Sequence, residues 1–469
     1  MRILGFGGNQ LAAGGYNVDN SLRFDDGSSD YLDRTPASAS NRKTWTFSCW
    51  VKRGNLTGAQ QHIIQMFPAG TGYTRVFFEN DESLSCDGTD SSAGNAFELT
   101  TNRLFRDVSA WYHIVVALDT TQGTASNRLK IYVNGTQETS FETETYPAEN
   151  IDYQINNNEQ HNIGRYNGGS EYFDGYMAEV VLIDGQQLDP TSFGEFDEDT
   201  GIWKPINVSG LTFGTNGFYL DFENSGSLGA DVSGNGNNFT VNNLTSVDQS
   251  TDTCTNNFAT LNPLTNEDTD ITLSQGNLDY ANSGTGDETV FASIGVSSGK
   301  WYFETKWTDT SNYMDIGVGS ANEGDIGSPR ADAEGTGYYM IQLRTASPGT
   351  RPFDNGSAGS GLGNSALNDI NMFAIDMDNN KFFAGKNGTW YSSGDPASGS
   401  NPLITMDDGF TTLIPIVCGK SNSAVSVNFG SPSYTISSGN SDGNGYGNFE
   451  YSVPSGYYAL NTKNLAEFG

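Results

Sequence analysis

The sequence predicts an all-β protein made of two antiparallel β-sandwich domains, and three observations support this prediction. Gly accounts for 57 of the 469 residues, about 12% against an ordinary value of about 7%. The helix-favouring residues Leu, Ala, Lys, Arg and Glu are scarce beside Thr, Tyr, Phe, Asn and Gly. Short runs of alternating apolar residues recur between Gly and Asn turns, and residues 44–222 show no sustained helical periodicity.

The charge balance excludes several classes of function. The chain carries 23 Lys and Arg against 56 Asp and Glu, which gives a formal net charge of −33. Such a surface repels nucleic-acid phosphates and anionic lipids, so neither nucleic-acid binding nor membrane insertion is expected. No apolar run approaches the roughly 20 residues of a membrane helix. Residues 1–16 hold one basic residue and no sustained apolar segment, so they are not predicted to be a secretory signal peptide.

Four segments predict the strands of the first domain. Trp45–Lys52 places Trp45, Phe47, Cys49 and Val51 on one face, whereas Trp111–Leu118 is apolar on both faces. Leu129–Val133 runs into Asn134-Gly135, a strong hairpin signal, and Met177–Ile183 is a further buried run.

The pattern changes between residues 223 and about 282, where Asn, Ser, Thr, Asp and Gly dominate, and this stretch is read as loop with short strands. Strand signals then resume at Lys300–Trp307. They recur about every 8–15 residues, which is typical of a second sandwich. The remaining expected strands are residues 314–319, 338–344, 372–377, 381–384, 414–417 and 424–429.

Five segments occur in the order found in a known jelly roll: Ser21–Leu32, Trp45–Val51, Ala110–Val115, Ile131–Gly135 and Tyr172–Val180. On these residues, the stretch from Ser21 to about Phe222 resembles the concanavalin A-like, laminin-G-type domain. A D-x-S-G-N-G-N loop usually opens such a domain, but here it follows the last strand, at Asp231–Asn237. We therefore expect a permuted closing strand and extend the first domain to about Leu244.

A second set of segments points to a different sandwich: Gly299–Glu304, Ile316–Gly319, Phe373–Asp376, Lys386–Gly388, Val427–Gly430 and Pro454–Asn461. Residues from about Asp270 to Leu465 thus look like a SPRY-type domain. A jelly roll followed by such a domain, ending in Ala-Leu-Asn-Thr, is similar to virion-associated proteins of tailed bacteriophages. Because fold alone does not give function, this resemblance supports only an expectation.

The predicted organisation has four parts. Residues 1–19 form a flexible, Gly-rich N-terminal arm, which in a virion protein would serve as an anchor. Residues 20–244 form the concanavalin A-like, laminin-G-like domain, residues 245–269 a connector, and residues 270–469 the SPRY-like domain. The four cysteines contain no C-x-x-C pair, and Cys49 and Cys418 are expected to be small buried apolar residues.

No motif predicts catalysis. Glu195–Thr200 comes nearest to the paired carboxylates of laminarinase-type glycosidases, but its third position does not fit and its flanking Gly residues suggest a loop. The two Gly-x-Ser-x-Gly matches, Gly295–Gly299 and Gly439–Gly443, lack the strand–turn–helix context of a nucleophile elbow. Of the three histidines, His113 alternates with apolar neighbours and is expected to be a satisfied sheet residue. We therefore predict that the protein is not an enzyme.

The sequence offers two candidate binding sites. Asp231, Ser233 and Asn235 place short oxygen side chains at alternate positions beside Gly residues, which suits Ca²⁺; the alternative is a plain Asx-rich turn without a metal ion. No cofactor is required.

The second candidate is a glycan site that combines aromatic rings with hydrogen-bonding partners on loops: Trp390, Tyr391, Arg351 and Asn355. The alternative is that Trp390 folds back onto its own sheet.

The resulting functional prediction is a structural bacteriophage virion protein, assembled in the host cytoplasm. It would be a tail fibre, appendage or decoration subunit that presents lectin-like surfaces to a host glycan or receptor. Its partners would be other virion proteins and further copies of itself, a trimer among the options. The alternatives are a virion-associated polysaccharide depolymerase and a purely structural capsid or tail decoration protein without a ligand.

Overall fold

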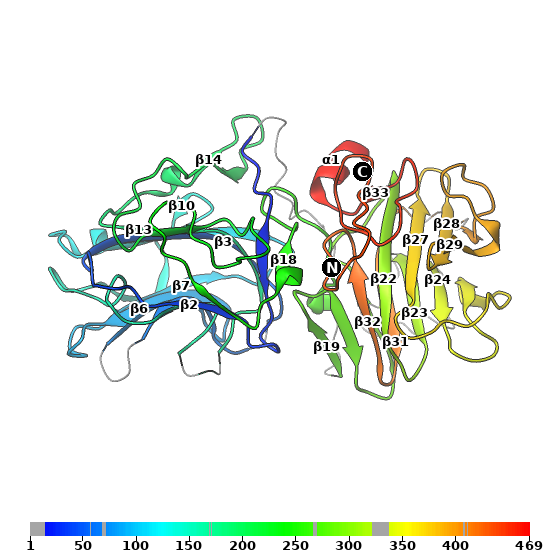
Figure 1. Ribbon diagram of the computed structural model, residues 1–469, viewed down its shortest axis with the longest axis horizontal. Helices are drawn as coiled ribbons and strands as arrows, with labels where there is room; N and C mark the ends of the chain where they lie inside the picture. The colour runs from blue at the N-terminus through cyan, green and yellow to red at the C-terminus, as the bar shows by residue number, and fades with distance from the viewer. Residues whose placement is uncertain are drawn as a thin grey trace. The chain divides into compact units, whose positions relative to one another are not determined.

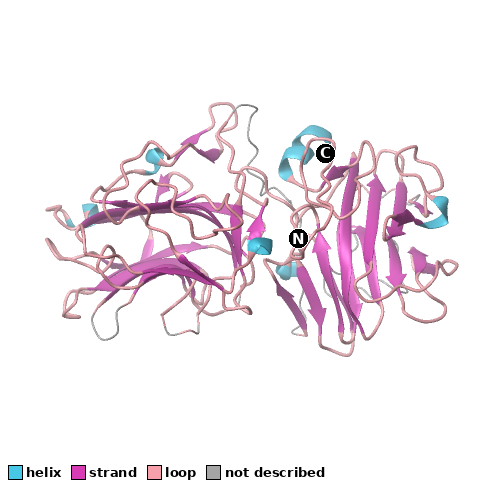
Figure 2. Cartoon of the chain, in the orientation of Figure 1, coloured by secondary structure: helices cyan, strands magenta, loops and turns pink. Residues whose placement is uncertain are grey.

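The computed structural model divides into two compact units, residues 9–256 and residues 257–469. The structure describes residues 15–56, 58–67, 72–167, 169, 171–265, 270–320, 337–406, 409 and 411–469. Strands dominate both units, and helical segments are short (Figure 2). No described helix has the length and apolar character needed to cross a membrane.

The N-terminal unit is a sandwich of two antiparallel sheets, A and B. In Figure 1, sheet A carries the labels β3 and β13, and sheet B carries β2, β6 and β7. Sheet A has the order β10-β9-β8-β3-β13-β1-β18, with β16 also paired to β13. Its strands are β1 (Ser21–Phe24), β3 (Thr44–Arg53), β8 (Trp111–Asp119), β9 (Leu129–Val133), β10 (Thr136–Gln137), β13 (Gly175–Asp184), β16 (Phe218–Leu220) and β18 (Gln249–Ser250).

Sheet B has the order β11-β7-β6-β5-β4-β12-β2-β17. Its strands are β2 (Tyr31–Arg34), β4 (Gln61–Met66), β5 (Tyr73–Phe78), β6 (Ser83–Thr89), β7 (Phe97–Leu104), β11 (Phe141–Thr145), β12 (His161–Ile163) and β17 (Thr240–Asn242). The main core lies between the two sheets, where Phe47 and Ile114 from sheet A join Val76 and Leu99 from sheet B.

The outer face of sheet A is covered by the chain itself. A hairpin of β14 (Gly194–Phe196) and β15 (Trp203–Pro205) lies above it in Figure 1. Val181 and Phe213 belong to one apolar cluster under this cover, and Trp50 and Trp203 to another. The apolar residues that both faces of β8 carry are thereby buried, as its sequence predicts. The short helical turns of this unit are η1 (Ala125–Asn127), η2 (Pro190–Ser192) and η3 (Ser246–Asp248).

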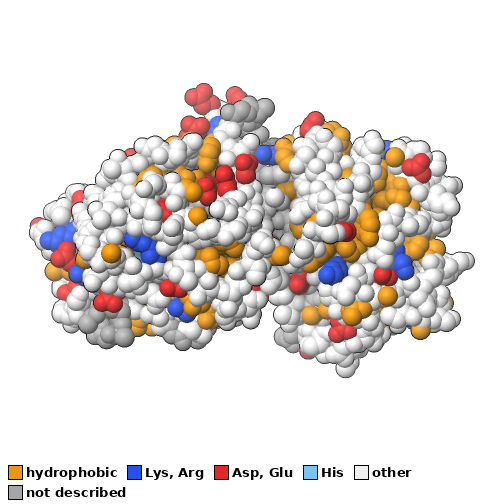
Figure 3. Space-filling view, viewed as in Figure 1, with side chains coloured by type: hydrophobic (Ala, Val, Ile, Leu, Met, Phe, Trp, Pro, Cys, Tyr) orange, Lys and Arg blue, Asp and Glu red, His pale blue; other side chains and the backbone are white. Residues whose placement is uncertain are grey.

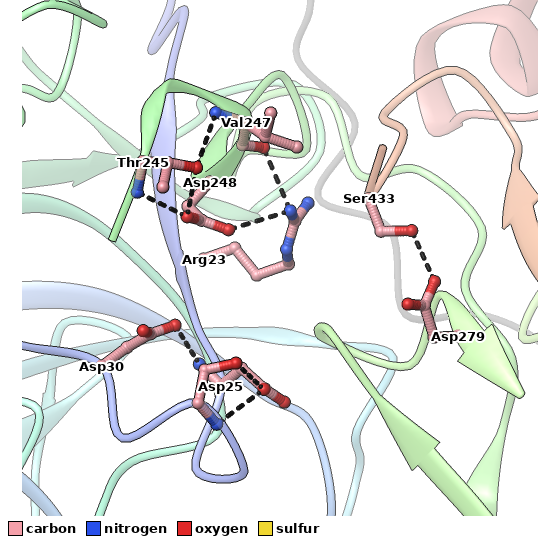
Figure 4. Close-up of polar contacts among 9 residues, drawn as sticks. Arg23, Asp25, Asp30, Thr245, Val247, Asp248, Asp279 and Ser433 are labelled. Atoms are coloured by element: carbon pink, nitrogen blue, oxygen red, sulfur yellow. Dashed lines mark hydrogen bonds and ion pairs between the residues drawn. The ribbon is translucent and has the colours of Figure 1, made fainter. Parts of the chain in front are cut away.

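Strands from the end of the unit pair with its first two strands, one in each sheet. β17 pairs with β2, and β18 pairs with β1. Arg23 holds the closing segment: one Nη donates to the Asp248 carboxylate at 3.1 Å and to the carbonyl of Val247 at 3.0 Å (Figure 4). The Asp248 carboxylate in turn accepts the Thr245 amide at 2.7 Å, which caps η3.

The chain boundaries differ from the predicted ones. Residues 245–256 belong to the N-terminal unit, and residues from Asn257 belong to the C-terminal unit, where Phe258 and Leu261 are buried. The stretch predicted as a connector is therefore divided between the two units. Its single apolar residues are enough to pack each part against its own unit, although the surrounding sequence is polar. Of the predicted arm, residues 1–14 lie outside the described part of the chain, whereas Tyr16 and Val18 pack on the outer face of sheet A.

The C-terminal unit is a second antiparallel sandwich. Its larger sheet, C, has the order β19-β20-β32-β22-β27-β28-β29, with β30 paired to β28 and β33 to β22. The strands of sheet C are β19 (Ile271–Ser274), β20 (Asp279–Asn282), β22 (Lys300–Thr310), β27 (Ile370–Asp376), β28 (Lys381–Lys386), β29 (Thr389–Trp390), β30 (Ile404–Thr405), β32 (Ser423–Asn428) and β33 (Tyr458–Ala459).

The smaller sheet, D, has the order β21-β31-β23-β24-β25-β26. Its strands are β21 (Asp287–Phe291), β23 (Met314–Ser320), β24 (Tyr338–Leu343), β25 (Arg351–Asp354), β26 (Ser357–Ala358) and β31 (Leu413–Lys420). The core between sheets C and D includes Trp301, Trp307, Ile316 and Ile416. The remaining elements are η4 (Pro263–Thr265), η5 (Tyr391–Ser393) and α1 (Thr462–Phe468).

Candidate functional site

The outer face of sheet B carries a continuous line of polar side chains. One row of directly opposed residues across β2, β12, β4, β5, β6 and β7 is apolar and lies in the core: Leu32, Ile163, Ile64, Val76, Cys86 and Leu99. The next row is polar and consists of Asp33, Asn162, Gln65, Arg75, Asp87 and Glu98. Because adjacent residues of a strand point to opposite faces, this polar row faces away from the core.

Hydrogen bonds hold the polar row in place. Arg75 binds Asp87 through both carboxylate oxygens, at 2.9 and 2.5 Å. The segment after β12 reaches over the row: the Arg165 Nε donates to the Asn162 Oδ1 at 3.0 Å, and the Asn167 amide donates to the Gln65 Oε1 at 3.1 Å. The row is therefore preorganised before any ligand arrives.

Some polar atoms of this face have no protein partner. Gln65 Nε2, Asn162 Nδ2 and His62 Nδ1 are buried and form no hydrogen bond, and all three residues are fully buried. Gln65 and Asn162 are directly opposed across β4 and β12. A buried polar group without a partner costs free energy, so adjacent donors of this kind are suited to the oxygen atom of an ordered internal water.

Aromatic side chains border the polar row. Phe67 lies 6.0 Å from Tyr73 and 5.5 Å from Tyr166 between ring centroids, and all three rings are half-buried. The Arg75 guanidinium lies 4.8 Å from the Tyr73 centroid and 4.5 Å from that of Phe77. At the other end of the row, Tyr31 and Tyr172 form a second aromatic pair, with centroids 6.4 Å apart.

The three histidines do not gather at one site and are neutral. Burial lowers the pKa of His62 and of His113 to about 3 and that of His161 to about 4. The Trp203 Nε1 donates to the His113 Nδ1 at 2.9 Å, so the His113 Nε2 carries the proton and faces the Ser48 hydroxyl at 2.9 Å. This nitrogen cannot take a proton from Ser48, and the expectation that His113 is a satisfied sheet residue is confirmed.

The predicted calcium loop is held by protein donors. The Asp231 Oδ1 accepts the amides of Tyr219 and Ser233, and its Oδ2 accepts the Ser233 hydroxyl and the Asn237 amide. Asn235 turns its Nδ2 toward the carbonyls of Gly214 and Gly217, at 2.7 and 2.9 Å. No group of three or more His, Cys, Asp or Glu residues suited to a metal ion occurs in the described chain. The geometry favours the Asx-rich turn, and calcium binding stays a prediction.

The predicted glycan residues lie on different sheets. Arg351 and Asn355 belong to β25 and the turn after it, in sheet D, whereas Trp390 ends β29 in sheet C. Trp390 packs on its own sheet, 6.4 Å from the Tyr302 ring, as the alternative reading expected. Tyr391 packs against the core of the sandwich.

The acidic run Glu195–Thr200 begins on β14 and continues into the turn of the β14–β15 hairpin. The Asp197 Oδ1 accepts the amides of Asp199 and Thr200, and Lys204 pairs with both Glu195 and Asp197. The sequence-based expectation of a loop is confirmed for residues 197–200 and is wrong for Glu195 and Phe196, which pair with β15. These carboxylates do not lie side by side on the face of a main sheet.

Residues 26–188 match the family described as the Concanavalin A-like lectin/glucanases superfamily. This stretch of the N-terminal unit is thus similar to concanavalin A-like domains. The matched range spans most of sheet B, including every residue of the polar row. A comparison with curated proteins gives no match.

Several solved structures resemble parts of the chain. The SPRY domain of human HERC1 is 17% identical, with a TM-score of 0.29, and the match covers 36% of this chain and 96% of that one. The native heptameric SAP-like pentraxin from Limulus polyphemus is 14% identical, with a TM-score of 0.27 and coverages of 37% and 80%. The TRIM65 PSpry domain is 15% identical, with a TM-score of 0.27 and coverages of 36% and 91%.

The sequence alone does not predict the polar row, although it contains part of the pattern that such a row requires. Tyr73, Arg75 and Phe77 alternate with buried residues in β5, as expected for one face of a strand. What the sequence does not show is the register that brings Arg75 opposite Gln65 and Asp87. Breaks in register within β4 and β6, at His62/Ile64 and Ser83/Ser85, shift that alignment.

Proposed function

We propose that the protein is a non-enzymatic, lectin-like attachment protein whose concanavalin A-like domain binds carbohydrate on the outer face of sheet B. The observation that carries the proposal is the polar row beside half-buried aromatic rings. Sugars offer hydroxyl groups to planar amides and carboxylates and apolar C–H faces to aromatic rings.

We further propose that the chain is a structural protein of a tailed-bacteriophage virion, as a tail fibre, appendage or decoration subunit. Support comes from the resemblance of its two-domain arrangement to such proteins. Its partners would be other virion proteins and copies of itself, and its target a host glycan or receptor. The net charge of −33 also argues against a nucleic-acid role. Lys and Arg are scattered over the described part of the face drawn in Figure 3.

One observation favours a polysaccharide depolymerase as a second candidate. Asp87 and Glu98 are directly opposed on β6 and β7, and burial raises the pKa of Asp87. Retaining glycosidases use two carboxyl groups about 5 Å apart, a spacing that opposed residues of neighbouring strands can provide. Against this role, Arg75 engages both oxygens of Asp87, which leaves this carboxylate poorly available as a nucleophile.

Binding of purified chain to a panel of bacterial surface polysaccharides tests the main proposal. Removing one stacking ring costs about 1–1.5 kcal/mol, so Tyr166→Ala or Tyr73→Ala should weaken binding about tenfold. Phe196→Ala is the matched control, because Phe196 is 52% exposed on the β14–β15 hairpin, away from sheet B. Equal affinity of wild type and both Tyr variants would exclude this face as the binding site.

Two further measurements separate the alternatives. Release of reducing ends that Glu98→Gln abolishes would establish the depolymerase, whereas binding without release supports the lectin. Cryo-electron microscopy of an intact particle that carries this chain would show whether sheet B faces outward or contacts only virion proteins. The second outcome would favour a purely decorative role.

A further inference from the structure

Two arginines of the C-terminal unit converge on one oxygen atom. Arg344 directly follows β24, and Arg351 begins β25, where it is opposed to Gln342. The Arg344 Nε donates to the Gln342 Oε1 at 2.6 Å. Arg351 donates to the same oxygen through its Nε at 3.3 Å and an Nη at 3.1 Å. Gln342 is only 1% exposed, so its side chain is held in place, and hydrogen bonds to its Oε1 keep the two guanidinium groups close together.

Aromatic rings fix the direction of both side chains. The Arg344 guanidinium lies 4.8 Å from the centroid of Tyr313, whose hydroxyl donates to Asp287 at 2.7 Å. The Arg351 guanidinium lies 4.8 Å from the centroid of Phe353. Held in this way, the two groups lose little conformational entropy when a ligand binds.

The charge of the pair is not neutralised within the described residues. Neither Arg344 nor Arg351 forms an ion pair there, although the chain holds 56 carboxylates. The nearby Lys420 pairs with Asp287 at 3.1 Å, and Gln342 turns its Nε2 toward Asp315 at 3.4 Å. A guanidinium has five N–H donors, and Arg344 uses one and Arg351 two on Gln342. Most donors of the pair are therefore available to an anion.

We propose that Arg344 and Arg351 form an oxyanion site that binds the carboxylate of an acidic saccharide. Two neighbouring guanidinium groups repel one another, and a bound carboxylate removes this repulsion while accepting forked hydrogen bonds. A saccharide fits better than an acidic protein segment or a nucleic acid, because the net charge of −33 repels dense polyanions at long range. Both arginines are half-buried, which suits a single charged group rather than a charged surface. The site is separate from the polar row.

Calorimetric titration of the full chain with a galactose oligomer that carries one galacturonate residue tests the proposal. The methyl ester of the same oligomer is the matched neutral ligand and should bind at least tenfold more weakly. The Arg344→Gln/Arg351→Gln double variant should also lose at least tenfold in affinity for the acid form. An Arg344→Gln/Arg351→Lys variant should not regain the lost affinity, because Lys cannot form the forked contact. Wild-type binding should weaken as the salt concentration rises.

Three controls make the result decisive. Arg106→Gln removes an exposed arginine of the N-terminal unit and should leave binding unchanged. The double variant should keep wild-type binding of any polysaccharide that the sheet B site binds, so that failure of this site and failure of the sheet B site are distinguished. Circular dichroism and the melting temperature show that each variant is folded. The proposal is overturned if wild type does not bind the oligomer with one galacturonate residue, if the methyl ester or a poly-Glu peptide binds equally well, or if the double variant keeps wild-type affinity.

Discussion

Glu304 shows at the scale of one residue how a buried carboxylate fixes a long loop. It is fully buried on β22 and accepts the amides of Glu450 and Tyr451, at 2.9 and 2.8 Å, and the Tyr302 hydroxyl at 2.8 Å. Burial raises its pKa to about 6. The segment around residue 450 is held over sheet C because Glu304 is a fixed acceptor for two of its backbone amides. No sequence pattern predicts this contact.

Glu304→Gln should destabilise the protein by about 1–3 kcal/mol. The substitution replaces one acceptor oxygen with an NH₂ group that faces a backbone N–H, and a buried donor without an acceptor costs this much. Urea unfolding followed by fluorescence measures the change. The same substitution at Glu467, which is exposed on α1, is the control and should change stability by less than about 0.5 kcal/mol. Equal stability of wild type and Glu304→Gln would show that the loop does not depend on this carboxylate.

At the scale of the element, the β14–β15 hairpin is held to sheet A largely by Trp203. This side chain is 4% exposed, its ring stacks 5.9 Å from His113, and its Nε1 donates to the His113 Nδ1. Gly135 has a φ of +77°, and a Cβ there would come within 2.3 Å of the Trp203 ring. The Asn134-Gly135 turn is therefore fixed both by its own left-handed backbone and by the ring that packs on it.

Trp203→Ala should release the hairpin while the sandwich remains folded. Loss of a large buried aromatic side chain costs about 3–5 kcal/mol, and here the cost falls on a peripheral element. Hydrogen exchange should rise strongly in residues 194–205 and little in β3 and β8. Glu198→Ala, at an exposed position in the turn of the same hairpin, should leave exchange unchanged. A uniform rise throughout the unit would show that the hairpin and the sheets unfold together.

The strands differ in how far the sequence determines them. β3, β8, β22 and β27 were predictable because buried sheet centres need long apolar runs, and the structure confirms them. The polar row was not predictable, because it depends on the pairing of β4–β7 and β12. These strands are polar on one face, and bulges shift the register of the β4–β5 and β6–β7 pairs. No residue pattern in the sequence predicts these bulges. The candidate site therefore emerges only from pairing between distant segments.

At the scale of the whole molecule, buried ionisable groups of the N-terminal unit give stability two opposing dependences on pH. Burial raises the pKa of Asp30 and of Glu179 to about 7 and that of Asp174 to about 8. The folded state thus binds more protons than the unfolded chain above about pH 4, and stability is lost as pH rises through 7 to 8. The three histidines act in the opposite sense, because their lowered pKa values mean that the unfolded chain binds more protons below about pH 6.5.

The melting temperature of the N-terminal unit should therefore be highest between about pH 5 and 6.5, where the two contributions largely cancel, and fall on both sides. Above pH 6.5 the histidines lose their remaining charge in the unfolded chain, so the carboxyl groups dominate and the melting temperature should decline by several degrees toward pH 8.5. Near pH 8.5 the buried thiols of Cys49, Cys86 and Cys254, whose pKa burial raises, add to this decline. Asp174→Asn, which mimics the protonated carboxyl, should reduce this alkaline decline and leave the acidic decline intact. Differential scanning calorimetry from pH 4 to 8.5 measures both limbs. A rise in stability from pH 6.5 to 8.5 would show that these carboxyl groups are ionised at no cost in the folded protein.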